Sequence, residues 1–138
     1  MAGLKIGALA RRTGTNAPTV RYYEEIGLLP RADRHQGGQR VYGEEDVSRL
    51  TFIRRCRDFG FSISQVRSLL ALAQDRQRSC LDARDVVRDH WAMVRARLGE
   101  LKALERSIAN LVADCETRCA GGPGVDCAVL HDLGSGVE

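Results

Sequence analysis

Histidine, proline and aromatic residues are scarce in this sequence, with three histidines, three prolines and 5% aromatics. No apolar stretch approaches the roughly 18 residues that a membrane-spanning helix needs. The first 14 residues lack a long apolar core and a small-residue cleavage site, so we expect no signal peptide and a cytoplasmic protein. No Ser/His/Asp or paired-carboxylate arrangement stands out, which argues against an enzyme.

Lysine is also scarce, because nineteen of the 21 basic residues are arginine. Residues 1–57 carry eleven basic and six acidic side chains, a net charge of +5, whereas residues 58–138 carry ten and twelve, a net charge of −2. The planar guanidinium group of arginine favours bidentate contacts with phosphate and guanine. The basic first part suggests a polyanionic partner, although an ordinary solvated surface explains the charge equally well.

Two short helices separated by a glycine-containing turn are predicted near the N-terminus. Apolar side chains recur at helical spacing from Lys5 to Arg12, and the Thr-Gly-Thr-Asn sequence at 13–16 then interrupts the pattern and supplies N-cap residues. A second helix is expected from about Ala17 to Ile26, with Gly27 as its C-terminal stop. This arrangement is the helix-turn-helix pattern, whose second helix enters the DNA major groove.

Turn-forming residues follow between Leu28 and Tyr42. A glycine pair separates short extended pieces there, and residues 39–42 alternate as a strand does, so the segment is expected to form a small hairpin, or wing. Two more helices are expected, over about residues 44–59 and 63–72. Acidic residues open the first, where the helix dipole favours them, and a capping box of the type Ser-x-x-Gln opens the second.

A long helix is expected from about Leu81 to Cys115, where the chain contains no proline and a single glycine. These roughly 35 residues span about 50 Å. An apolar stripe with coiled-coil spacing follows the helix. It consists of Val87, Trp91, Val94, Leu98, Leu101, Leu104, Ile108, Leu111, Val112 and Cys115. Too little chain remains to cover this stripe in an intramolecular bundle, so a homodimer is predicted.

Five motifs follow one another in order between residues 4 and 72. They are Ile6-Gly7-x-Leu9-Ala10, Thr19-Val20-Arg21-Tyr22-Tyr23-Glu24-x-x-Gly27-Leu28-Leu29, Gly38-x-Arg40-x-Tyr42, Leu50-x-Phe52-Ile53 and Phe59-Gly60-Phe61-Ser62. In order and spacing they resemble the MerR family of transcription regulators. The resemblance implies a winged helix-turn-helix, a long antiparallel dimerisation helix and an effector site near the C-terminal end of that helix. It also implies that the regulator distorts an over-long promoter spacer for RNA polymerase when its effector binds.

The resemblance assigns DNA-binding roles to residues of the recognition helix, the wing and the helix that follows. They are Thr19, Arg21, Tyr22 and Tyr23, then Arg40 and Tyr42, then Arg54. From the residue types alone, Arg21 suits a base edge or a phosphate, and tyrosine hydroxyls can bond the sugar-phosphate backbone. Taken alone, two adjacent tyrosines are more often partly buried packing residues. Cys56 matches no sensing position and is expected to be a small buried side chain.

The other four cysteines are expected to be reduced, and clustered thiols indicate metal binding or redox chemistry. Cys115, Cys119 and Cys127 follow the spacing C-x3-C-x7-C across a Gly/Pro-rich loop that suits a soft or borderline metal ion. A straight helix holds Cys80 about 50 Å from Cys115 within one chain. In the antiparallel dimer that the resemblance implies, Cys80 of one subunit joins the three thiols of the other, giving two sites per dimer.

Cys80 also bears on the identity of the ion. MerR members that sense zinc, cadmium, lead or mercury carry a cysteine at the start of the dimerisation helix, whereas sensors of copper, silver or gold carry a serine. The resemblance therefore implies a soft divalent ion as effector. The loop departs from both patterns, since Cys119 is an additional thiol and the gap before Cys127 is similar to that of the copper sensors. His131 is a further nitrogen donor, although a surface histidine is the more usual interpretation.

Three alternative functions share this fold. A Cu(I)- or Ag(I)-sensing regulator is one. A thiol-based redox sensor with disulfides or an iron–sulfur cluster is another, but members of that kind cluster their cysteines more tightly. A drug-binding regulator is the third, but such members usually carry a much larger C-terminal domain than the twenty or so residues that follow the long helix here.

The sequence therefore predicts a mainly α-helical chain with three parts. They are a winged helix-turn-helix DNA-binding domain at 1–75, a coiled-coil dimerisation helix at 76–116, and a metal-binding loop, short helix and tail at 117–138. The predicted function is a homodimeric regulator that binds promoter DNA. It activates efflux or detoxification genes when a soft divalent ion binds.

Overall fold

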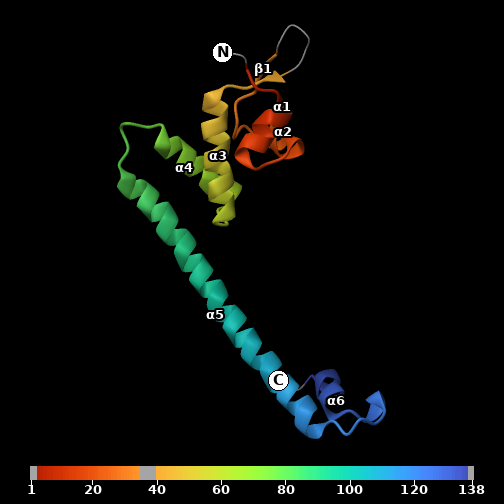
Figure 1. Ribbon diagram of the computed structural model, residues 1–138. Helices are drawn as coiled ribbons and strands as arrows, with labels where there is room; N and C mark the ends of the chain where they lie inside the picture. The colour runs from red at the N-terminus through yellow and green to blue at the C-terminus, as the bar shows by residue number, and fades with distance from the viewer. Residues whose placement is uncertain (1–2, 35–39, 137–138) are drawn as a thin grey trace. The chain divides into compact units, whose positions relative to one another are not determined.

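The computed structural model describes residues 3–34 and 40–136 and divides the chain into two compact units, Met1–Arg88 and Asp89–Glu138. The elements of the first unit are α1 (Ile6–Thr13), α2 (Ala17–Glu25), β1 (Asp33–Arg34), β2 (Arg40–Val41), α3 (Glu44–Asp58), α4 (Ile63–Ala73) and the start of α5 (Cys80–Arg118). The second contains the rest of α5, the short 3₁₀ helix η1 (Gly124–Asp126) and α6 (Ala128–Ser135). Figure 1 shows this order along the chain.

The predicted helix-turn-helix is confirmed, and local signals explain where its helices begin and end. α1 ends at Gly14, whose φ of +72° lies in the left-handed region that glycine adopts without strain. The Asn16 side chain then caps α2 by accepting a hydrogen bond from the backbone N–H of Thr19 over 2.9 Å. Gly27, with a φ of +79°, turns the chain just after α2.

The predicted wing is present as two short antiparallel strands. β1 pairs with β2 so that Asp33 lies opposite Val41. Beyond β2, Leu4 and Tyr42 exchange both backbone hydrogen bonds, at 2.7 and 2.8 Å, and so join the N-terminal segment to the wing. The predicted glycine turn at 37–38 lies outside the described residues.

Helix α3 begins with the predicted acidic residues, α4 begins at the predicted capping box, and both helices contribute to a hydrophobic core. Asp46 accepts a hydrogen bond from the Gly43 backbone over 2.9 Å at the start of α3. At the start of α4, Ser62 and Gln65 form the reciprocal capping box at 3.1 and 2.8 Å. The largest fully buried side chains are Leu9, Val20, Leu28, Leu29, Tyr42, Leu50, Ile53 and Val66. They belong to one hydrophobic core, which is built from residues of α1, α2, α3 and α4 and of the segments around the wing.

The long helix is also confirmed. α5 has 39 residues, slightly more than the predicted span, and its first turns contribute Ala83 and Val86 to the packing around the core of the first unit. Along residues 3–34 and 40–136, no helix combines the length and the apolar character needed to cross a membrane.

Candidate nucleic-acid interface and metal centre

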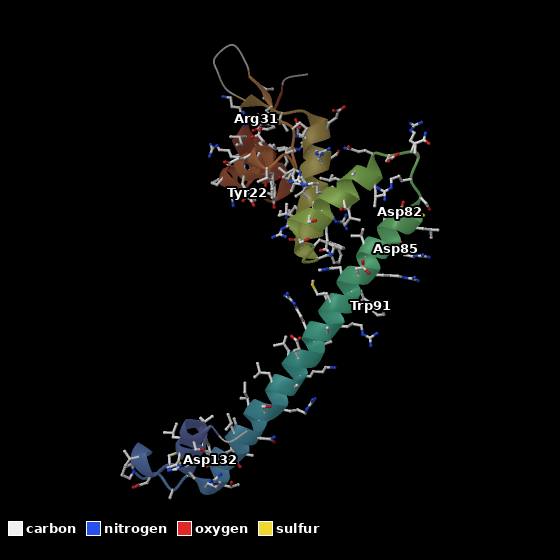
Figure 2. The ribbon with its side chains drawn as sticks, turned by 180° about the vertical axis from the view of Figure 1, so that it is seen from behind. Tyr22, Arg31, Asp82, Asp85, Trp91 and Asp132 are labelled. Atoms are coloured by element: carbon white, nitrogen blue, oxygen red, sulfur yellow. The ribbon has the colours of Figure 1, made fainter. Side chains whose placement is uncertain are left out.

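The exposed side of α2 carries three of the predicted DNA-binding residues. Arg21 is exposed, and Tyr22 is 49% exposed and projects from α2 (Figure 2). Thr19 is half-buried in the first turn of the same helix. An exposed guanidinium group and an exposed phenol on the same helix can donate hydrogen bonds to base edges and phosphates, as a recognition helix requires.

Tyr23 and Tyr42 are core residues, so the prediction that their side chains contact DNA is not supported. Tyr23 is 7% exposed and Tyr42 is 1% exposed. The Tyr42 hydroxyl donates to Glu24 Oε1 over 2.9 Å, and the Ala32 backbone N–H donates to Glu24 Oε2 over 3.0 Å. Glu24 belongs to α2, whereas Ala32 and Tyr42 flank the two strands. These bonds therefore attach both sides of the wing to the recognition helix.

Arg54 lies against the turn of the helix-turn-helix. A Cβ atom built at Gly14 would lie 2.9 Å from Arg54 Cζ, so the guanidinium group packs over that turn. Arg54 Nη2 also lies 3.9 Å from Asp58 Oδ2, and the side chain is 47% exposed. A cation beside the turn that precedes a recognition helix is suitably placed for the DNA backbone. Of Arg40, the structure describes only the backbone, which lies in β2.

Arg31 is a basic residue near the recognition helix that the sequence motifs did not single out. It is exposed (Figure 2), and it lines a shallow hollow with Arg21, Glu24 and Glu25. Because Arg31 follows α2 by several residues, its place beside Arg21 depends on the turn at Gly27. The sequence feature that could have indicated this position of Arg31 is the run from Leu28 to Pro30, because this run follows the turn at the end of α2.

An exposed ion pair joins α1 to the start of α3. Arg12 donates to both carboxylate oxygens of Glu44, at 2.7 and 3.2 Å. These hydrogen bonds, and then the positive charge of Arg12, lower the pKa of Glu44 below its usual value. Since β2 leads directly into α3, the pair braces the base of the wing against the helix-turn-helix.

The four predicted metal ligands lie at the two ends of α5 and beyond it. Cys80 is the first residue of α5 and is exposed. Cys115 lies in the last turns of α5, Cys119 follows its end, and Cys127 is the N-cap residue of α6. The Cys119 N–H donates to the Cys115 carbonyl over 3.1 Å, which keeps these two residues one helical turn apart. No group of three or more His, Cys, Asp or Glu side chains is assembled for a metal ion within the described part of the single chain.

Arg118 holds the segment that carries the last three cysteines. Its Nη1 atom lies 3.3 Å from Asp132 Oδ2 on α6 and 3.8 Å from Asp114 Oδ2 on α5. Figure 2 labels Asp132 in this part of the second unit. The ion pair links the end of α5 to α6, and so it connects the two helices that flank the segment between Cys119 and Cys127.

The donor set fits a soft metal ion better than a hard one. Exposed thiols at positions 80, 115 and 119 and a half-buried thiol at 127 are suitable ligands for such ions once deprotonated. Cys56 differs, because burial raises the pKa of its thiol and favours the protonated form that does not ligate. It packs half-buried against the core of the first unit, close to what the sequence predicted.

An exposed recognition helix, a two-stranded wing attached to it and a following long helix define a DNA-binding regulator of the winged helix-turn-helix class. The family model for the MerR HTH family regulatory protein matches residues 4–73, and a second, described as MerR, DNA binding, matches residues 47–111. The chain therefore belongs to the MerR family, whose members regulate transcription by binding DNA and are not enzymes.

Relatives match nearly the whole chain. Heavy metal-dependent transcription regulator 2 of Rhizobium meliloti is 34% identical over 96% of this chain and 88% of its own length. The HTH-type transcriptional regulator ZntR of Escherichia coli K12 is 34% identical over 97% and 94%. The crystal structure of PbrR691 from Ralstonia metallidurans in complex with lead(II) matches with a TM-score of 0.82 and 35% identity, over 94% of this chain and 98% of that one.

Proposed function

We propose that this chain is a homodimeric, metal-responsive transcription regulator that a soft divalent ion, namely zinc, cadmium, lead or mercury, switches at a promoter. The observation that carries the proposal is the exposed Cys80 at the first residue of α5, with three further thiols at and beyond the other end of that helix. Similarity to a heavy-metal-dependent regulator and to a lead(II)-bound structure also supports a metal-responsive regulator.

The apolar stripe of α5 supports the homodimer. Its side chains are exposed in the single chain. Burying them against a second copy is the main favourable contribution to the free energy of dimerisation. They are Val87, Trp91, Val94, Leu98, Leu101, Leu104, Ile108, Leu111 and Val112. On this proposal residues 76–116 form the dimerisation helix, residues 1–75 the DNA-binding domain and residues 117–138 the metal-binding segment.

An antiparallel pair of α5 helices would place the start of one beside the end of the other. Cys80 of one subunit then completes a site with Cys115, Cys119 and Cys127 of the second subunit, and twofold symmetry makes two such sites. Thiolates bind soft ions by releasing protons, so the ion links the subunits through negatively charged ligands. His131 follows Cys127 by one helical turn and is exposed, as a surface histidine is.

At the promoter, Thr19, Arg21 and Tyr22 of each subunit bind the DNA major groove, and Arg40 and Arg54 contact the DNA backbone. Tyr23 and Tyr42 support these residues from inside the core. Ion binding changes the orientation of the two recognition helices relative to each other and so deforms the promoter. RNA polymerase can then transcribe the efflux or detoxification genes.

The test is promoter activation by purified protein and RNA polymerase, with salts of zinc, cadmium, lead(II), mercury(II) and copper(I) added in turn. We expect a divalent ion to activate the wild type and Cys80→Ser to abolish the response while leaving operator affinity unchanged. Cys56→Ser is the matched control and should respond as the wild type does. A normal divalent response by Cys80→Ser would contradict the shared site, and a response to copper(I) alone would favour a monovalent sensor.

A further inference from the structure

Side chains from two other helices hold the turn that ends the recognition helix. α2 has no basic residue in its own last turn, although the free carbonyls at a helix C-terminus favour positive charge. Arg67 Nη2 donates to the Ile26 carbonyl over 2.8 Å, and Arg49 Nε donates to the Leu28 carbonyl over 2.7 Å. Between these carbonyls, Gly27 lies in contact with Arg67, whose Nη1 is 3.7 Å from the position of a Cβ there. The turn is therefore attached to α3 by Arg49 and to α4 by Arg67.

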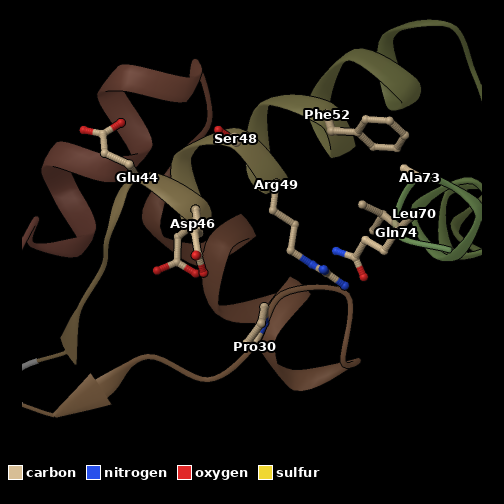
Figure 3. A pocket seen from close by; sticks show the side chains of 10 residues that line it. Pro30, Glu44, Asp46, Ser48, Arg49, Phe52, Leu70, Ala73 and Gln74 are labelled. Atoms are coloured by element: carbon tan, nitrogen blue, oxygen red, sulfur yellow. The ribbon is translucent and has the colours of Figure 1, made fainter. Parts of the chain in front are cut away.

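Arg49 makes its contact on the side of α3. It extends from that helix into a pocket that Pro30, Phe52 and Leu70 also line (Figure 3). This pocket is lined by residues of α3, the end of α4 and the segment after α2, and none of its lining residues comes from α5. Arg49 therefore links the recognition helix only to its own domain.

Arg67 has different surroundings, because it lines a cavity that includes the start of α5. The wall is formed by residues of α4, by Arg78 between the helices, and by Asp82 and Val86 of α5. Arg78 Nε and Asp82 Oδ2 form an ion pair of 3.2 Å at the start of α5. Asp82 and Val86 lie in the same first two turns of α5 as Cys80. One side chain thus contacts the end of α2 and faces the junction of α4 with α5.

We propose that Arg67 is a positioning residue that couples the start of α5 to the orientation of the recognition helix. The inference rests on the proposed function, because the signal is the displacement of α5 when an ion binds Cys80. A displacement of Asp82 and Val86 alters the cavity wall beside Arg67. Hydrogen bonds depend steeply on distance and angle, so an intact bond to Ile26 transfers this shift to the turn after α2. The transferred shift changes the angle at which α2 enters the DNA major groove.

The contact can be removed without loss of the fold. The Arg67–Ile26 bond lies on an exposed side chain, and an exposed polar contact contributes little to stability. Arg67→Met keeps an unbranched apolar side chain in place of the arginine stem but removes the donor, and Arg67→Lys keeps a cationic donor. Arg49→Met is the matched control, because it removes the same kind of bond to the same turn from a residue whose pocket includes no residue of α5.

The experiment measures operator affinity without ion, ion stoichiometry, and ion-dependent transcription for the wild type and the three variants. The ions are the zinc, cadmium, lead(II) and mercury(II) salts used above. We expect Arg67→Met to bind the operator within about threefold of the wild type, as surface substitutions do, and to bind the ion in the same ratio. Its activation by the ion should fall about tenfold, within the range of allosteric couplings. Arg67→Lys should recover part of the response, and Arg49→Met should keep the wild-type ratio of activated to basal transcription.

Two results would overturn the coupling role. One is full activation of Arg67→Met, and the other is an equal loss of operator affinity with and without ion, which a purely structural role predicts. Failure of the wild type to respond to any of these ions would instead contradict the proposed function and, with it, the signal assigned to Arg67. The wild-type measurement therefore distinguishes failure of the coupling from failure of the function.

Discussion

Replacing Tyr42 by phenylalanine tests whether the wing is held on the recognition helix by a buried hydrogen bond. The substitution removes only the hydroxyl that donates to Glu24 over 2.9 Å, and the ring stays in a site where the side chain is 1% exposed. Apolar burial is thus preserved, so the change in the free energy of unfolding reports the hydrogen bond.

The magnitude follows from the type of partner. A hydrogen bond to a charged group contributes about 1.5–3 kcal/mol, and the acceptor here is a carboxylate that is 5% exposed. We expect Tyr42→Phe to lose about 2 kcal/mol. With a urea dependence of about 2 kcal/mol per molar, the unfolding midpoint should fall by roughly 1 M. Because the wing is attached through Glu24, operator affinity should also fall.

The assay is urea unfolding followed by circular dichroism at one fixed protein concentration, since dimerisation makes stability depend on concentration. Tyr22→Phe is the matched control, because its hydroxyl belongs to a side chain that is 49% exposed, and it should stay within about 0.5 kcal/mol of the wild type. If the two variants lose the same small amount, the buried bond does not hold the wing and the reasoning is refuted.

Two further predictions concern the DNA interface and the dimer. Arg21→Ala should weaken operator binding by about tenfold or more, with or without ion, because a base or phosphate contact contributes about 1–3 kcal/mol; unchanged anisotropy titrations at fixed salt would contradict its place on the recognition surface. Leu101→Glu should shift the protein from dimer to monomer in sedimentation equilibrium with unchanged helicity, whereas Lys102→Glu on the neighbouring face should leave the dimer intact. A persistent Leu101→Glu dimer would show that the apolar stripe is not the interface.

Local chemistry made most of the helices predictable from the sequence. The Asn16 cap and the Ser62–Gln65 box mark where α2 and α4 begin, and Gly14 marks where α1 ends. α5 was predictable because no proline interrupts a long apolar stripe. Each of these signals acts over a few residues, so it does not depend on the rest of the fold.

Contacts between distant segments were not predictable in the same way. Tyr42 matched a wing motif, yet its hydroxyl bonds a residue 18 positions away and its backbone pairs with Leu4. Arg67 reaches Ile26 across 41 positions. Neither partner is marked by spacing or composition, since the packing of α2, α3 and α4 brings them together. The proposed metal centre rests on the family resemblance, because the described residues of a single chain do not assemble its thiols.

The most direct test of the account is a mixed dimer in which one chain carries Cys80→Ser and the other carries Cys115→Ser, Cys119→Ser and Cys127→Ser. If the site is shared between subunits, this dimer retains one complete set of thiols. We predict that it binds one ion where the wild type binds two, and that it activates transcription, whereas neither variant homodimer does. A mixed dimer that binds no ion, beside a wild type that binds two, would contradict a site built from both subunits.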